Sequence, residues 1–198
     1  DLKIFCFSGE NYITEKIGEL LFKISAKSFF QTNSYQTSKL YNIVKKFANL
    51  KGDEIVYDLY CGIGTISLFL SKEAKKIIGI ETVKDAVQAA KSNSKLNNIS
   101  NCKFIEGDVK DTIAKPIEVN EKPDIIIVDP PRNGLEKSVI KSIIGLSPNK
   151  IIYVSCNSST QARDIIDLKE FYEIKTSQAI DMFPQTYHVE NVVLLEKI

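Results

Sequence analysis

The chain has 198 residues, a net charge of +1, and hydrophobic and charged fractions of 43% and 26%. This length and composition are ordinary for one well-cored globular domain with a small addition, and no apolar run approaches the roughly 20 residues of a membrane-spanning helix. The near-neutral charge gives no overall signal for nucleic-acid binding, so a protein of small-molecule substrates stays open at this point.

The amino-terminal part is predicted to form short strands over residues 1 to about 27, with a turn at residues 8–11, and to pack at the edge of the main domain. Because the chain starts with Asp1 rather than Met, and directly in an apolar segment, we expect it to be cut from a longer protein. We therefore predict a lead-in segment at 1–27 and a main domain at 28–198. A helix is predicted over residues 34–48, where apolar side chains recur at helical spacing.

From residue 54 onward, predicted strands and helices alternate. The strands cover residues 55–59, 76–80, 103–105, 124–128 and 151–154, with two late strands near 172–180 and 189–195. The helices cover residues 65–74, 83–96, 136–144 and 159–168, and residues 115–123 are expected to be a surface loop. This alternation predicts an α/β fold with a mostly parallel, doubly wound sheet and a late antiparallel edge strand.

A glycine-rich loop at residues 58–65 follows one predicted strand and opens a helix. Glycines let the backbone pass close to a ligand, and a helix start favours ligand phosphates or carboxylates. Ser67 stands where a dinucleotide-binding loop has its third glycine, so the spacing instead fits the looser loop of S-adenosylmethionine enzymes. A plain tight turn is the alternative.

Two acidic residues end the next two strands. Glu81 is placed to accept hydrogen bonds from ribose hydroxyls, and Asp108 from an adenine amino group. The alternatives are a solvated glutamate that caps the following helix and an ordinary turn aspartate.

The motif Asp-Pro-Pro-Arg at residues 129–132 follows the most apolar strand. Its two prolines force a rigid, extended exit from the sheet. Related motifs in methyltransferases hold the methyl acceptor, and those that methylate amino groups usually have an aromatic residue where this chain has Arg132. This difference argues against an exocyclic amine as substrate.

Cys156 ends an apolar strand and precedes a polar run that can start a helix. A thiol at the carboxyl edge of a parallel sheet is a candidate nucleophile, and a following helix amino terminus would favour its thiolate. A buried core cysteine is the alternative. Glu190 is a candidate general base if it is desolvated, whereas His188, the only histidine, is more often structural.

The remaining cysteines are Cys6, Cys61 and Cys102, and none of the four forms a C-x-x-C pair. We therefore expect no metal site, and reduced thiols of a cytoplasmic protein.

Taken in order, several motifs resemble the RNA uracil-5-methyltransferase family. They are residues 28–33 (Ser-Phe-Phe-Gln-Thr-Asn), the loop at 58–65, residues 129–132, residues 155–157 (Ser-Cys-Asn) and residues 188–190 (His-Val-Glu). The resemblance implies a Rossmann-like class I methyltransferase fold, S-adenosylmethionine as cofactor, and methylation of C5 of a uridine in RNA through a covalent cysteine–C6 adduct. It assigns cofactor binding to Gln31, Tyr60, Thr65, Glu81, Asp108 and Asp129, the nucleophile to Cys156 and the base to Glu190.

The chain departs from this family at two positions. Ser158 stands where many members have proline, and Thr65 where asparagine is common, which leaves methionine recognition open. The chain is similar to the catalytic domain alone, without the RNA-binding domain or iron–sulfur cysteines of some members. We expect RNA as partner, 23S rRNA rather than tRNA. Two alternative functions are an RNA cytosine-5-methyltransferase and a non-catalytic cofactor- or RNA-binding module. RNA cytosine-5-methyltransferases usually have a second cysteine after the proline-rich strand, and this chain has no counterpart of it near residues 129–131.

Overall fold

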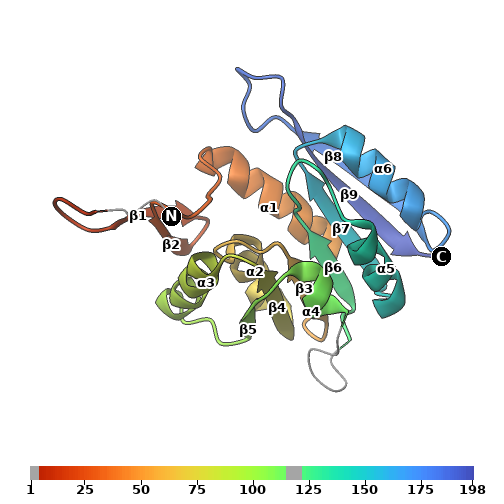
Figure 1. The fold of residues 1–198 in the computed structure, drawn as a ribbon, viewed down its shortest axis with the longest axis horizontal. Coiled ribbons are helices and arrows are strands. Elements are labelled where there is room, and N and C mark those ends of the chain that lie inside the picture. Colours follow the sequence, from red (N-terminus) through yellow and green to blue (C-terminus); the bar gives the residue numbers. More distant parts are fainter. Residues whose placement is uncertain (1–4, 115–121) are drawn as a thin grey trace.

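The structure is a computed structural model that describes residues 5–114 and 122–198 (Figure 1). Most of the loop predicted at 115–123 and the first four residues lie outside these ranges. Residues 5–11 form bends and irregular structure, so the described part of the opening segment contains no strand before Tyr12.

The first element is a hairpin of β1 (Tyr12–Ile17) and β2 (Leu20–Ser25), which forms a separate two-stranded antiparallel sheet. Its backbone is held by helix α3 (Lys84–Leu96): Asn93 and Asn97 accept hydrogen bonds from the N–H groups of Lys23 and Leu21 at 2.8 and 2.9 Å. The predicted packing against the main domain is confirmed, while the boundary between residues 27 and 28 stays a prediction.

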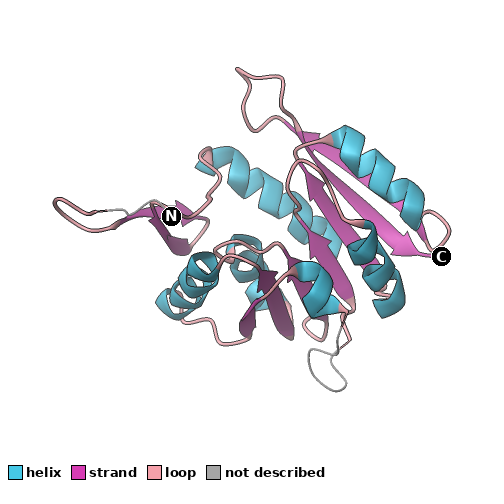
Figure 2. Cartoon of the chain, viewed as in Figure 1, coloured by secondary structure: helices cyan, strands magenta, loops and turns pink. Residues whose placement is uncertain are grey.

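The main sheet has seven strands in the order β5-β4-β3-β6-β7-β9-β8; Figure 1 labels them and Figure 2 shows the strands in magenta. The five parallel strands are β3 (Ile55–Leu59), β4 (Lys76–Glu81), β5 (Cys102–Glu106), β6 (Ile125–Val128) and β7 (Lys150–Ser155). The antiparallel addition predicted at one edge is confirmed: β9 (Glu190–Lys197) inserts between β7 and the outer strand β8 (Tyr172–Ile180), antiparallel to both.

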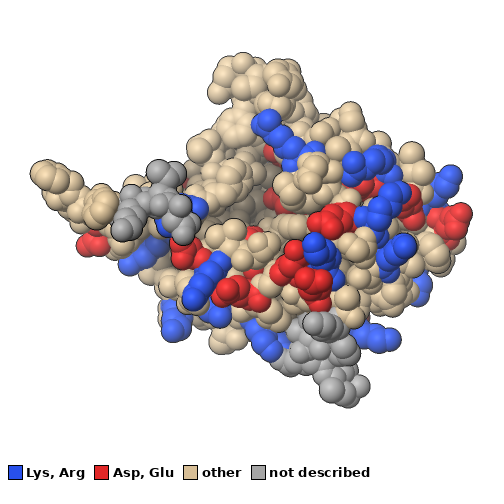
Figure 3. Space-filling view, viewed as in Figure 1, with Lys and Arg blue, Asp and Glu red and all other residues tan. Residues whose placement is uncertain are grey.

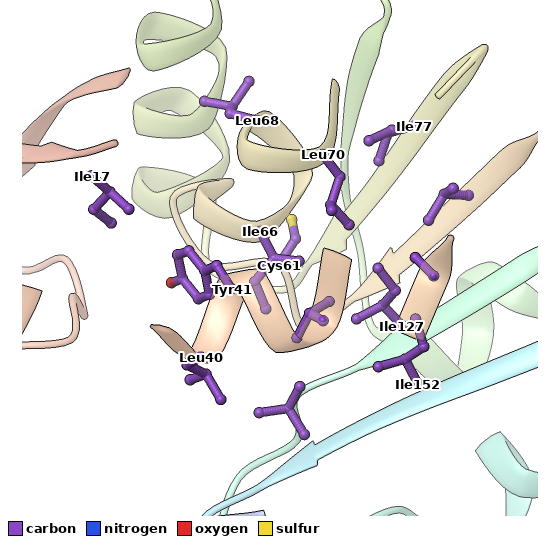
Figure 4. Close-up of a cluster of buried hydrophobic side chains, with 14 of the residues drawn as sticks. Ile17, Leu40, Tyr41, Cys61, Ile66, Leu68, Leu70, Ile77, Ile127 and Ile152 are labelled. Atoms are coloured by element: carbon purple, nitrogen blue, oxygen red, sulfur yellow. The ribbon is translucent and has the colours of Figure 1, made fainter. Parts of the chain in front are cut away.

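Helices cover both faces of this sheet, as a doubly wound fold requires. One face carries α1 (Ser34–Ala48), α2 (Thr65–Leu70) and α3, and the other carries α4 (Val109–Ile113), α5 (Lys137–Leu146) and α6 (Ser158–Leu168). The four residues of β6 are all buried and alternate between the two cores: Ile125 and Ile127 pack into one, Ile126 and Val128 into the other. Figure 4 shows part of the first core, including Ile127 and the ring of Tyr41.

Two helix predictions differ from the structure. The predicted helix 65–74 ends at Leu70 and tightens into a short 3-10 helix, η1 (Ser71–Glu73). Helix α4 was not predicted, because its five residues give too short a window for apolar periodicity. Neither difference moves the carboxyl ends of β3, β4, β6 and β7, where open α/β sheets bind their ligands.

Candidate active site

A pocket open to solvent, with an empty volume of about 400 Å³, lies at the carboxyl ends of β3 and β6. Four of the six residues predicted to bind the cofactor line it: Gln31, Tyr60, Thr65 and Asp129. Phe29 and Phe30 from the segment before α1 add apolar wall. The sequence segments 28–33, 58–65 and 129–132, which are far apart in the chain, therefore meet at one place.

The glycine loop is shaped by left-handed backbone at Tyr60, Gly62 and Gly64, with φ of 65°, 54° and 81°. At Gly64 a side chain would also collide, because a Cβ there would lie 2.8 Å from the ring of Phe104. This close packing brings the start of α2 against the sheet and leaves the loop backbone at the pocket.

Glu81, the last residue of β4, is bound to this loop. Its two carboxylate oxygens accept hydrogen bonds from the N–H groups of Gly62 at 3.0 Å and Val83 at 2.8 Å. Val83 precedes α3, so the helix-capping alternative describes part of its role. A carboxylate has about four acceptor positions, so Glu81 keeps acceptor capacity for ribose hydroxyls.

Asp108 lies outside the pocket lining and is exposed. Its side chain caps α4 by accepting from the N–H of Lys110 at 3.0 Å, and the Lys110 ammonium lies 3.5 Å from its other oxygen. The structure thus gives Asp108 the capping role of a turn aspartate, and its contact with adenine stays a prediction.

Two pocket residues were given no role by the sequence analysis. Tyr41 of α1 donates its hydroxyl to Thr65 Oγ1 at 2.7 Å, and burial raises its pKa, so the hydroxyl stays protonated. Its helical spacing indicated only a core residue. Asp58 is 1% exposed and accepts a hydrogen bond from Ser67 through Oδ2, whereas Oδ1 has no hydrogen-bond partner within the described part of the chain. Burial raises the pKa of Asp58 to about 7, against the hydrogen bonds from Ser67. The available signal was a carboxylate inside an apolar strand.

Asp129 follows β6 and connects the pocket to a second group of titratable side chains. Burial raises its pKa to about 8, and the charges of Glu190 and Asp58 act in the same direction. Asp129 thus lines the pocket and is also sensitive to the charge of Glu190.

Cys156 is half-buried between Ser155, the last residue of β7, and Asn157, whose side chain caps α6 by accepting from Ser159 N at 3.1 Å. Burial raises the pKa of the thiol, as do the charges of Glu190 and Asp129; Arg132 opposes them. The predicted position at a strand end before a helix is confirmed. The favourable contribution of the α6 amino terminus to the thiolate stays a prediction, whereas burial and the two carboxylates favour the thiol.

Glu190 begins β9 and is 8% exposed. Burial raises its pKa, and the Arg132 guanidinium lowers it in part. The desolvation that the sequence analysis required of a general base is therefore present. Cys156 and Glu190 are the next residues beyond the paired Ser155 and Asn191 of β7 and β9. The charges of Glu190, Asp129 and Arg132 all act on the Cys156 thiol, and we call these four residues the catalytic cluster.

Arg132 is fixed through its backbone. Its carbonyl accepts hydrogen bonds from Asn157 Nδ2 at 3.1 Å and Thr160 Oγ1 at 3.2 Å, which joins the Asp-Pro-Pro-Arg loop to the first turn after Cys156. Its guanidinium Nη2 lies 3.4 Å from Nε2 of His188. His188 thus packs beside the cluster from the loop before β9.

All four cysteines are free, and residues 5–114 and 122–198 contain no group of three His, Cys, Asp or Glu placed to hold a metal ion. Over the same ranges no helix is long and apolar enough to cross a membrane. On the face shown in Figure 3, cationic and anionic side chains are interspersed around a hollow rather than gathered into one basic patch.

The fold and the position of the pocket are those of a Rossmann-like class I methyltransferase. The Pyrococcus abyssi tRNA (uracil-54, C5)-methyltransferase, solved in complex with S-adenosyl-L-homocysteine, superimposes with a TM-score of 0.82 at 36% identity, covering 95% of this chain and 45% of that one. The tRNA (uracil-5-)-methyltransferase family model matches residues 7–198, so the chain belongs to this family.

Similar proteins from bacteria are also named as RNA methyltransferases. A protein of Bacteroides thetaiotaomicron named as an uncharacterized RNA methyltransferase is 48% identical over 99% of the chain, and one of Clostridium acetobutylicum with the same description is 50% identical over 96%. The chain spans 43% and 42% of the length of these two relatives.

Proposed function

We propose that this chain is the catalytic part of an enzyme that transfers a methyl group from S-adenosylmethionine to C5 of a uridine in RNA. The observation that carries the proposal is the position of Cys156 and Glu190 at the adjacent ends of β7 and β9, beyond the pair Ser155–Asn191, with Asp129 of the pocket lining acting on the Cys156 thiol. A nucleophile and a base of different chemistry, next to a separate ligand pocket, are what C5 methylation of uracil requires.

The pocket suits the cofactor chemically. S-adenosylmethionine offers an ammonium group, ribose hydroxyls and an adenine amino group as donors, and the pocket offers acceptors, including the unpartnered buried Oδ1 of Asp58. Gln31, Tyr60, Thr65 and Asp129 would hold the methionine end, and Glu81 the ribose. The cofactor supplies an electrophilic methyl group on a sulfonium centre.

The reaction follows from the chemistry of uracil, whose C5 is a poor nucleophile. The Cys156 thiolate forms a bond to C6, and the electron pair of the C5–C6 double bond moves into an enolate with charge at C5. C5 then forms a bond to the methyl carbon, whose bond to sulfur breaks with the electron pair left on sulfur as a neutral thioether. Glu190 removes the C5 proton, the double bond re-forms, and Cys156 leaves as a thiolate. The target base must leave its stack to reach this cluster.

The role of each charged group follows from its surroundings. Arg132 lowers the pKa of both Cys156 and Glu190, so it favours the two anions that the reaction uses. The raised pKa of Cys156 leaves most of the free enzyme as thiol at neutral pH, and we expect the rate to increase with pH. The RNA substrate and reduced thiols are consistent with a cytoplasmic reaction.

For the substrate we expect 23S rRNA rather than tRNA, although the archaeal relative is named for tRNA. The test is mass spectrometry of 23S rRNA and tRNA pools from cells that lack the gene, with the intact gene restored as control. Loss of 5-methyluridine from either pool supports the proposed reaction, and the affected pool identifies the substrate. Loss of 5-methylcytosine instead would favour the cytosine-5 rival, and no loss of a methylated pyrimidine would favour a non-catalytic module.

A further inference from the structure

The loop between β8 and β9, residues 181–189, is fixed at its base and projects from the molecule (Figure 1). Two side chains near the start of α1 hold the base: Gln36 Nε2 donates to the carbonyl of Asp181 at 2.8 Å, and Asn33 Nδ2 to that of Met182 at 2.9 Å. Met182 is fully buried. The segment that carries the cofactor-side residue Gln31 therefore leads directly into the helix start that positions this loop.

The outer part of the loop is ordered by its own turn and carries an exposed ring. The N–H of Thr186 donates to the carbonyl of Phe183 at 2.8 Å, and Thr186 Oγ1 accepts from the N–H of His188 at 3.2 Å. Between them, Tyr187 is 89% exposed. Its ring centroid lies 4.2 Å from that of His188, with an interplanar angle of 40°. The Tyr187 ring therefore contacts His188 and is still exposed to solvent, so it can stack on the aromatic ring of a ligand.

This pair of rings leads to the catalytic cluster. His188 lies against the Arg132 guanidinium, and Arg132 acts electrostatically on both Cys156 and Glu190. The succession Tyr187, His188, Arg132 thus extends from solvent to the groups that would hold the target uridine.

We propose that Tyr187 is a stacking platform for the base next to the target uridine, in single-stranded RNA. The inference rests on the proposed function, because extrusion of the target leaves its neighbour without one stacking partner. Aromatic side chains take up such bases regardless of sequence. Arg132, beside His188, is then placed for the phosphate between the two nucleotides. On the face shown in Figure 3, cationic and anionic side chains are interspersed, and stacking adds RNA contact that does not depend on a basic patch.

Other exposed aromatic side chains fit this role less well. Phe29 lines the pocket and belongs to the site already described. Tyr35 has the Lys39 ammonium 4.3 Å from its ring centroid, so one face is already occupied. Phe171 precedes β8 at the opposite end of the strand from Tyr187, which makes it a matched control for removing an exposed ring.

The first test measures methyl transfer by the protein at its full natural length, with the Tyr187→Ala, Tyr187→Phe and Phe171→Ala variants. Stacking predicts that Tyr187→Ala raises the KM for RNA about tenfold, with kcat within about twofold and the KM for the cofactor unchanged. Tyr187→Phe and Phe171→Ala should match the wild type. An unchanged RNA KM in Tyr187→Ala, or an equal loss in Tyr187→Phe, would overturn the proposal.

The second test does not depend on methyl transfer. The chain contains no tryptophan, so Tyr187→Trp introduces a single tryptophan into the 198-residue chain, which can be excited at a wavelength where the tyrosines do not absorb. Titration with oligouridine should quench its emission, and a Phe171→Trp control should not respond. No quenching at millimolar oligouridine would overturn the proposal. Quenching without methyl transfer to any RNA would instead refute the proposed reaction and leave the stacking surface standing.

Discussion

Replacement of Asp164 by alanine should destabilise the protein, because its carboxylate joins α6 to β7 and to the loop before α5. Asp164 is 1% exposed. It accepts hydrogen bonds from Leu135 N and Tyr153 Oη, both at 2.7 Å, and from Nε and Nη2 of Arg163 at 2.9 and 2.7 Å. Through Leu135 it holds the end of the loop that begins at Asp129.

The magnitude follows from which partners stay buried. Without the carboxylate, the Tyr153 hydroxyl and the Leu135 N–H have no acceptor, and each orphaned buried group costs about 1–3 kcal/mol. Arg163 is half exposed and can turn to water, so its loss adds little. We therefore expect Asp164→Ala to lose about 2–6 kcal/mol, the sum for the two orphaned buried groups. For a chain of this size that lowers Tm by roughly 10 °C.

The assay compares the free energy of unfolding in urea of the wild type and of Asp164→Ala. Asp167→Ala is the matched control. Asp167 lies on the same helix and pairs with the Lys137 ammonium at 2.8 Å, but both side chains are partly exposed. A surface pair of this kind is worth about 0–1 kcal/mol. If Asp164→Ala lost less than about 1 kcal/mol, or no more than Asp167→Ala, the argument from buried partners would be wrong.

Three further predictions concern the loop, the thiol and the cofactor. Gly134→Ala should lower the free energy of unfolding in urea by about 1–3 kcal/mol, because φ is 76° and the new Cβ would lie 2.4 Å from the Asp164 carboxylate. Its control is Gly145→Ala in α5, which has open space around it and should be neutral or slightly stabilising. Arg132→Ala should move the pH profile of Cys156 alkylation to higher pH, because Arg132 lowers the pKa of the thiol; a shift to lower pH would contradict this assignment. Glu81→Gln should weaken S-adenosylmethionine binding by about tenfold or more in calorimetry, since hydrogen bonds to a charged acceptor are stronger; unchanged affinity would place the ribose elsewhere.

The sequence was sufficient for the order of strands and helices because each element carries its own local signal. The apolar residues of β6 indicate a buried strand, and the polar run after Cys156 indicates the start of α6. Since the carboxyl ends of parallel strands share one edge, the same patterns also predicted that Tyr60, Asp129 and Cys156 would gather there.

Contacts between distant segments could not be predicted in this way. The hydrogen bond from Tyr41 to Thr65 joins residues 24 apart, and that from Leu135 to Asp164 joins residues 29 apart. Periodicity indicates only that such residues are buried, not which polar group they meet. The causes of the raised Cys156 pKa could not be predicted for the same reason, because its burial, Glu190 of β9 and Asp129 after β6 come together only in the fold.

The covalent role of Cys156 is the central claim, and one denaturing gel tests it most directly. The protein at its full natural length is incubated with labelled RNA and cofactor as wild type, Cys156→Ser and Glu190→Gln. The account predicts that Glu190→Gln accumulates a protein–RNA adduct, because attack and methyl transfer occur but the C5 proton stays, and that Cys156→Ser forms none. An adduct in the Cys156→Ser lane would contradict the nucleophile assignment. No adduct with Glu190→Gln, despite normal RNA binding, would move the base to another residue, with Asp129 the next candidate.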